Sequence, residues 1–168
     1  MIRVAVLTIS DRSFRGERED RGGPAVSAAV ARLLDARVVE EKVLPDERTD
    51  IEWNLKRLAD TQVADLVLTT GGTGLASRDV TPQATAAIVE YEVPGLAEAM
   101  RAATRAAVPT AVLSRQVAGV RERTLFVNLP GSPRGAVECL EVIAPVLPHA
   151  VATLRGEDAD AHPRSELV

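Results

Sequence analysis

One segment of the chain, residues 69–82 (TTGGTGLASRDVTP), gathers three glycines, several hydroxyl side chains and one acidic residue. It follows the apolar run ADLVL at 64–68, which is typical of a strand buried on both faces of a parallel sheet. The glycines allow positive φ and leave backbone N–H groups uncovered, so an anion or a flat ring can approach the main chain. Thr81 is a candidate N-cap with Pro82 at the first helical position, and a helix N-terminus beside exposed amides favours phosphate. The segment therefore predicts a phosphate-binding turn between a strand and a helix.

Asp79, two residues before that cap, is at odds with a simple anion site. A carboxylate repels a phosphate unless a cation lies between them, and Mg²⁺ binds one or two carboxylates together with phosphate oxygens. The segment also lacks the lysine of a Walker A loop and the last glycine of GxGxxG. Two interpretations stay open on the local pattern. One is a magnesium and phosphate site, and the other is a structural turn in which Arg78 and Asp79 form a solvated pair.

Strand-like and helix-like segments alternate along the whole chain. Strand patterns occupy residues 2–9, 37–44, 64–68, 111–113 and 124–127, and helical patterns occupy residues 24–34, 49–58, 82–89, 95–107 and 137–147. This alternation predicts an α/β fold, a three-layer α/β/α sandwich around a mainly parallel sheet. We expect a single domain over residues 1–154, a mobile loop over residues 14–23 and a charged C-terminal tail over residues 155–168.

In such sheets ligands bind beyond the carboxyl ends of the strands, where the strand order reverses. Polar loops follow most of the predicted strands and should share this rim: Ser10-Asp11, Pro45-Asp46, residues 71–79, Ser114-Arg115 and residues 128–132. Asp46 and Asp79 supply acids there, and no histidine or lysine base belongs to these loops. The pattern favours direct transfer of a phosphate-containing group by metal, positioning and electrostatics.

Several of these residues also have a structural interpretation. Asp46 can simply shape its turn, Asp11 can act as an Asx-type cap, and Ser132 stands where an N-cap of the last helix is expected. We expect Asp20 to be solvated and Trp53 to pack in the core or in an interface.

The composition argues against several classes of protein. A net charge of −4 gives no support to nucleic-acid or anionic-membrane binding. Cys139 is the only cysteine, so neither an internal disulfide nor a cysteine zinc site can form, and its helical register predicts a buried thiol. The first residues do not resemble a signal peptide, and no uninterrupted apolar run reaches the roughly 18 residues of a membrane span. We therefore predict a cytoplasmic protein without membrane attachment.

Five stretches of the chain, in this order, closely resemble the molybdopterin adenylyltransferase family of molybdenum cofactor biosynthesis, which is related to the gephyrin G domain. They are LTISDRSFRGEREDRGG (7–23), LPDE (44–47), TTGGTGLASRDVTPQAT (69–85), PTAVLSRQVAGVR (109–121) and NLPGSP (128–133). The resemblance covers essentially the whole chain. It implies a molybdopterin-binding, usually trimeric α/β fold. It also implies an enzyme that transfers AMP from Mg-ATP to the terminal phosphate of molybdopterin and releases pyrophosphate, with a molybdenum-insertion enzyme as a candidate partner.

By that resemblance, Asp46 and Asp79 form the acidic catalytic pair and hold Mg²⁺. The residues that would bind the nucleotide or the pterin are Ser10, Asp11, Gly71, Gly72, Thr73, Gly74, Ser77, Ser114, Arg115, Pro130, Gly131 and Ser132. The alternative is a noncatalytic molybdopterin-binding carrier or scaffold of the MoaB type, which keeps the pterin pocket without productive nucleotide binding. A generic nucleotide-binding regulator is a third hypothesis. The presence of both acids favours the enzyme.

Overall fold

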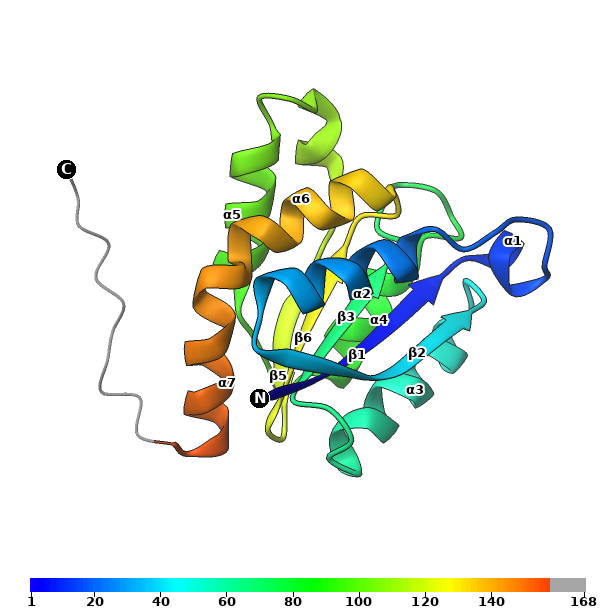
Figure 1. The fold of residues 1–168 in the computed structure, drawn as a ribbon. Helices are drawn as coiled ribbons and strands as arrows, with labels where there is room; N and C mark the ends of the chain where they lie inside the picture. The colour runs from blue at the N-terminus through cyan, green and yellow to red at the C-terminus, as the bar shows by residue number, and fades with distance from the viewer. Residues whose placement is uncertain (158–168) are drawn as a thin grey trace.

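The computed structural model describes residues 1–157, which form a six-stranded sheet between two layers of helices (Figure 1). The strands are β1 (Ile2–Ile9), β2 (Ala36–Leu44), β3 (Leu66–Thr70), β4 (Tyr91–Glu92), β5 (Ala118–Arg121) and β6 (Thr124–Leu129). The helices are α1 (Asp11–Phe14), α2 (Gly22–Leu33), α3 (Arg48–Asp60), α4 (Thr81–Ile88), α5 (Pro94–Thr104), η1 (Pro109–Leu113), α6 (Pro133–Ile143), η2 (Ala144–Val146) and α7 (Leu147–Arg155). The predicted α/β sandwich is confirmed.

The sheet has the strand order β2-β1-β3-β6-β5-β4. β2, β1, β3 and β6 run parallel, whereas β5 is antiparallel to both β6 and β4. The chain passes from β1 outward to β2 and then returns to the other side of β1 as β3. The strand order therefore reverses between β1 and β3, and ligands of open α/β sheets bind beyond the carboxyl ends of the strands at such a point. Those ends are Ile9 and Thr70.

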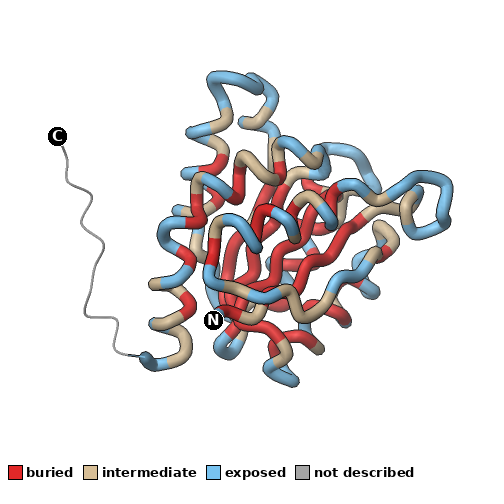
Figure 2. Tube along the Cα trace, in the orientation of Figure 1, coloured by how far each residue is buried: buried red, intermediate tan, exposed pale blue. Residues whose placement is uncertain are grey.

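The central strands are buried on both faces because helices cover both sides of the sheet (Figure 2). Successive side chains of a strand point to opposite faces. Val4 and Val6 of β1 accordingly pack in the cluster that contains residues of α2, α5, α6 and α7. Ala5 and Leu7 pack in the cluster that contains residues of α3 and α4. This double burial explains why β1 and β3 read as continuous apolar runs.

The C-terminal helical segment, Pro133–Arg155, has 23 residues and a mean hydropathy of 1.5, and is long and apolar enough to cross a membrane by length and composition. Charged residues such as Glu138 and Glu141 interrupt this segment, so it contains no long uninterrupted apolar run. Leu140, Leu147 and other apolar side chains of this segment are buried in the core against the sheet. The core of the fold therefore accounts for part of its apolar character, since 33% of its most apolar 18-residue window is buried.

The predicted strand at residues 111–113 is wrong, because this stretch lies in the 3₁₀ helix η1. Pro109 occupies the first turn of η1, a position where the fixed φ of proline suits a helical start. Val112 and Leu113 are exposed, so they do not provide the buried face of a strand. The strand in this part of the chain is β5, which pairs with β6 through a tight turn in which Glu122 has φ 53°.

Asp65 lies at the amino end of β3, on the opposite edge of the sheet from the rim, and is almost fully buried. Its carboxylate accepts hydrogen bonds from the Arg3 N–H and guanidinium, both at 2.7 Å, and from Arg155 at 2.6 Å. Arg155 ends α7, so this contact fastens the last helix to the sheet. Only residues up to 157 of the predicted tail are described, and residues 158–168 lie outside the described residues.

Asp65→Asn is expected to lower the free energy of unfolding at neutral pH by about 2–3 kcal/mol, less than for a fully buried pair because both arginines keep contact with water. Burial alone would raise the pKa of Asp65, but the hydrogen bonds from Arg3 and Arg155 outweigh it and hold the pKa well below its usual range. The ion pairs therefore stabilise the fold above the unfolded-state pKa of 3.8, and this stability is lost as the pH falls towards the lower folded-state pKa.

Urea unfolding between about pH 7 and pH 2 measures both effects, and the Asn variant should lose part of the acid sensitivity of the wild type. Asp60→Asn is the matched control, since Asp60 pairs with Arg121 on the surface and its loss should change stability much less than the loss of Asp65. An Asp65→Asn variant with the stability and acid sensitivity of the wild type would refute the claim that the ion pairs of Asp65 stabilise the fold.

Candidate functional site

Two glycine turns lie side by side at the switch point of the sheet. Gly71 has φ +106°, and a Cβ there would overlap the Ile9 carbonyl oxygen at the end of β1. A Cβ on Gly131 would lie 3.3 Å from the Gly71 Cα. The Thr70 hydroxyl donates to the Pro130 carbonyl oxygen at 2.8 Å, which joins the two turns. The ends of β1, β3 and β6 therefore meet as the sequence predicted.

The other glycines of the 71–79 loop make room for the two acids. A Cβ on Gly72 would lie 3.2 Å from the Asp46 Oδ1, and a Cβ on Gly74 would lie 2.8 Å from the Asp79 Oδ2. Thr81 is not the predicted N-cap but the first residue of α4, with Val80 at the cap. Its hydroxyl instead donates to the Gly71 carbonyl oxygen at 2.9 Å, which closes the loop on itself.

Asp46 is held by a reciprocal pair of hydrogen bonds with Asp11. The Asp46 Oδ2 accepts from the Asp11 N–H at 2.7 Å, and the Asp11 Oδ1 accepts from the Asp46 N–H at 3.0 Å. Asp11 is therefore not the cap of α1, a role taken by Ser10, whose hydroxyl oxygen accepts from the Ser13 N–H. The pair fixes the turn after β2 against the turn after β1.

Asp79 faces the same pocket from the glycine loop. Its Oδ2 accepts from the Ala76 N–H at 2.8 Å. Within residues 1–157, the Oδ1 atoms of Asp46 and Asp79 have no hydrogen-bond donor. Burial, together with the charges of Asp11 and Asp79, raises the pKa of Asp46 despite the hydrogen bond from the Asp11 N–H. Two half-buried carboxylates that repel each other and keep free oxygens suit a divalent cation.

The residues of this pair fit magnesium better than zinc. Among the described residues there is no cluster of three or more His, Cys, Asp or Glu side chains that could hold a metal ion. Zinc sites normally need three or four such ligands, whereas Mg²⁺ is usually held by one or two carboxylates, water and substrate phosphates.

A pocket of about 210 Å³, here called the acidic pocket, contains both carboxylates. Of the predicted site residues, it is lined by Ser10, Asp46, Gly71, Gly72, Asp79 and Gly131. Five lining residues come from the loop that was predicted to be mobile, namely Arg18, Glu19, Asp20, Arg21 and Gly22. Asp20 is not simply solvated, because its carboxylate accepts from the Thr8 hydroxyl and from the Gly22 and Gly23 N–H groups at the start of α2.

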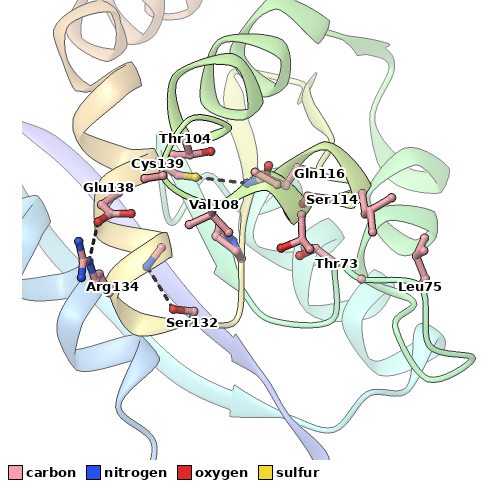
Figure 3. A pocket seen from close by; sticks show the side chains of 17 residues that line it. Thr73, Leu75, Thr104, Val108, Ser114, Gln116, Ser132, Arg134, Glu138 and Cys139 are labelled. Atoms are coloured by element: carbon pink, nitrogen blue, oxygen red, sulfur yellow. Dashed lines mark hydrogen bonds and ion pairs between the residues drawn. The ribbon is translucent and has the colours of Figure 1, made fainter.

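A second pocket of about 600 Å³, here called the large pocket, lies on the other side of the two turns (Figure 3). Of the predicted site residues, it is lined by Thr73, Gly74, Ser114, Pro130 and Ser132. Leu75, Val108 and Leu113 give it an apolar wall, and Cys139 and Gln116 close its inner end.

Individual side chains of the large pocket behave mostly as expected. Ser132 is the predicted N-cap, since its hydroxyl oxygen accepts from the Gly135 N–H at 3.3 Å. Cys139 is buried as predicted, and burial raises the pKa of its thiol, which disfavours a nucleophilic role. The buried Ser114 hydroxyl has no hydrogen-bond partner within residues 1–157, so it remains available to a ligand.

Three predicted site residues line neither pocket. Ser77 is exposed at the tip of the loop, and Asp11 acts through Asp46. Arg115 follows η1 rather than a strand, and it reaches the rim through its hydrogen bonds. It donates to the carbonyl oxygens of Gly74 at 2.7 Å and Asp79 at 2.5 Å, so it supports the loop.

Sequence reasoning missed Arg18, Arg21, Gln116 and Arg134 as pocket residues. The two arginines of the first loop could have been suspected from their position before the glycines of α2. Gln116 carried no such signal, because its amide is placed by contacts with the Asn128 carbonyl oxygen and the Cys139 sulfur. Trp53 is 61% exposed on α3, so of its two predicted placements the core is wrong and packing in an interface stays a prediction.

The fold and the site together define an α/β protein with two adjoining pockets at the switch point of its sheet. Residues 5–149 match the family model described as a probable molybdopterin binding domain, and the chain belongs to this family.

Curated relatives support the same assignment. The chain is 42% identical over 156 residues to the molybdopterin adenylyltransferase of Helicobacter pylori strain J99, which covers 92% of this chain and 89% of the relative. It is 45% identical over 141 residues to the molybdopterin adenylyltransferase of Escherichia coli K12, which covers 83% of this chain and 72% of the relative.

Solved structures share the fold. The molybdopterin biosynthesis enzyme MoaB from Thermus thermophilus superposes with a TM-score of 0.87 at 50% identity, over 93% of this chain and 98% of that chain. A structure of MogA superposes with a TM-score of 0.84 at 37% identity, over 90% of this chain and 99% of that chain.

Proposed function

We propose that this protein is a molybdopterin adenylyltransferase of molybdenum cofactor biosynthesis, an enzyme of the nucleotidyltransferase class that uses ATP and molybdopterin as substrates. The names of its curated relatives support this function. The observation that carries it in this chain is the placement of Asp46 and Asp79 in one pocket, beside two glycine turns that also line a second, larger pocket.

The two pockets suit different parts of the substrates. The large pocket has an apolar wall and a buried hydroxyl, which suit a heterocyclic ring. The acidic pocket is lined by four acids, Glu19, Asp20, Asp46 and Asp79, and by Arg18 and Arg21. Asp46 and Asp79 would hold a cation, and the cation, the two arginines and the glycine turns would together suit a chain of phosphates. Gly71 and Gly72 line the acidic pocket and Thr73 and Gly74 line the large one, so the reacting phosphates would meet along this loop.

In the proposed reaction, an oxygen of the molybdopterin phosphate attacks the α-phosphorus of ATP. The bond from the α-phosphorus to the bridging oxygen breaks, and pyrophosphate leaves with the electron pair. Among the described residues, neither pocket is lined by a lysine or a histidine, and the attacking phosphate needs no general base because it is already anionic. The contribution of the protein is therefore positioning and electrostatics.

Named residues would carry these roles. Asp46 and Asp79 would hold Mg²⁺, which supplies neutralisation of the phosphate oxygens when bound. Arg18 and Arg21 would stabilise the departing pyrophosphate by charge. Arg115 would keep the glycine loop in place through its backbone contacts. The other predicted ligands would bind the nucleotide or the pterin, as the resemblance implies. Ser77 and Asp11 line neither pocket, so they would not contact the substrates directly.

Wider properties of the protein also remain proposals. We propose one domain over residues 1–154, a cytoplasmic location, a homotrimer and transfer of the product to a molybdenum-insertion enzyme. The homotrimer is proposed from the resemblance to the family, whose members are usually trimeric.

Incubation of the protein with molybdopterin, magnesium and α-³²P-labelled ATP tests the function. Label should appear in adenylylated molybdopterin, with unlabelled pyrophosphate as the second product. Absence of labelled pterin under conditions in which the H. pylori relative forms it would refute the proposal. Calorimetry then distinguishes the enzyme from a noncatalytic carrier. A carrier would bind molybdopterin but show no binding of ATP with magnesium.

A further inference from the structure

The side chain of Arg78 leaves the glycine loop and binds two other loops of the rim. Its Nη2 donates to the Asp11 Oδ2 at 2.8 Å and its Nε to the same oxygen at 3.0 Å. Its Nη1 donates to the Glu47 Oε1 at 2.8 Å. Arg78 therefore does not form the solvated pair with Asp79 that the sequence allowed. One guanidinium joins the loops that follow β1, β2 and β3.

Asp11, which pairs with Arg78, is also hydrogen-bonded to Asp46. The Asp11 Oδ1 that accepts from Arg78 also accepts from the Asp46 N–H, and the Asp46 carboxylate accepts from the Asp11 N–H. Glu47 is the next residue after Asp46. Arg78 therefore contacts the turn that carries Asp46 both directly, through Glu47, and indirectly, through Asp11. On the other side, Asp79 is the next residue after Arg78. The two acids are thus linked through Arg78 and Asp11.

The segment that carries Asp79 needs such a link. Residues 75–78 are exposed, and within residues 1–157 the hydrogen bonds of Asp79 are made with Ala76 and Arg115. These contacts hold the shape of the loop. Among the described residues, the side-chain hydrogen bonds that join it to the loops around Asp46 come from Arg78.

We propose that Arg78 is a positioning residue that sets the separation of the Asp46 and Asp79 carboxylates by clamping the glycine loop to Asp11 and Glu47. The inference rests on the proposed function of the acidic pocket. The Arg78 side chain is 54% exposed, so its ion pairs contribute little to global stability. Its bidentate geometry still restricts the position of the loop.

The first test is structural and needs no substrate. In Arg78→Gln, backbone hydrogen exchange within residues 72–79 should accelerate about tenfold while exchange of β1 and β3 stays unchanged. Arg78→Lys keeps the charge and loses the bidentate hydrogen bonds of the guanidinium. Its exchange rate in the loop should therefore lie between those of the wild type and Arg78→Gln. Arg32→Gln is the matched control, because Arg32 is 56% exposed and pairs with Glu141 at 2.7 Å away from the rim.

The second test is kinetic. A shift of the carboxylates by about 1 Å should lower kcat of Arg78→Gln by about 10- to 100-fold and raise the magnesium concentration for half-maximal rate. KM for molybdopterin should stay within about twofold of the wild type, because Arg78 lines neither pocket. Glu47→Gln should show the same pattern with a smaller loss.

Several outcomes would overturn the proposal. They are unchanged exchange in the loop, accelerated exchange throughout the sheet, and a rise in the molybdopterin KM as large as the fall in kcat. A wild-type protein without transferase activity would refute the proposed function alone, since the exchange experiment still measures the clamp.

Discussion

Asp79→Asn is expected to lower kcat by about 10²- to 10³-fold, because it removes a charge that acts on the reacting phosphates. The amide is close in shape to the carboxylate, and its oxygen can still accept from the Ala76 N–H, so the loop should keep its conformation. Affinity for molybdopterin should change little if the ring occupies the large pocket, which Asp79 does not line. Steady-state kinetics and calorimetry with molybdopterin measure the two effects separately.

Asp50→Asn is the control for this variant, since Asp50 is an exposed acid in the first turn of α3 and lines neither pocket. It should keep wild-type kinetics. An equal loss of kcat and of pterin affinity in Asp79→Asn would instead show that the acid binds the ground state.

Gly71→Ala is expected to destabilise the fold by about 3–5 kcal/mol, the largest effect that we predict on stability. Gly71 has φ +106°, which L-residues rarely adopt, and a Cβ would overlap the Ile9 carbonyl oxygen. That oxygen belongs to the end of β1 and cannot move without disturbing the sheet. Urea unfolding measures the loss, and the variant should also lose activity because both glycine turns are displaced.

Gly16→Ala separates the two causes. Gly16 has φ +73° but a Cβ there would meet no atom within 4 Å, so only the backbone strain of about 1–2 kcal/mol applies. If Gly71→Ala cost no more than Gly16→Ala, the close approach of β1 and the glycine loop would not be essential.

The sequence predicted the features that depend on local pattern. The doubly buried β3, the rim at the strand ends and the N-cap at Ser132 are all confirmed, because apolar runs and turn residues determine them within a few positions. The strand predicted at residues 111–113 is wrong, because Val112 and Leu113 are apolar but exposed and the preceding proline begins a helical turn.

The contacts in the site between residues far apart in the sequence could not be predicted from local sequence patterns. The hydrogen bonds between Asp11 and Asp46 join residues 35 positions apart, and those between Arg78 and Asp11 join residues 67 positions apart. Each of these side chains is typical of a solvated loop when read alone. Only the strand order, which brings the ends of β2, β1 and β3 together, gives them partners.

A crystal structure of the protein with magnesium and a nonhydrolysable ATP analogue tests the central claim most directly. We predict one cation bound by a carboxylate oxygen of Asp46 and one of Asp79, with phosphate oxygens of the nucleotide in the acidic pocket. A nucleotide whose phosphates lie outside the acidic pocket, or a cation bound by neither aspartate, would contradict the account.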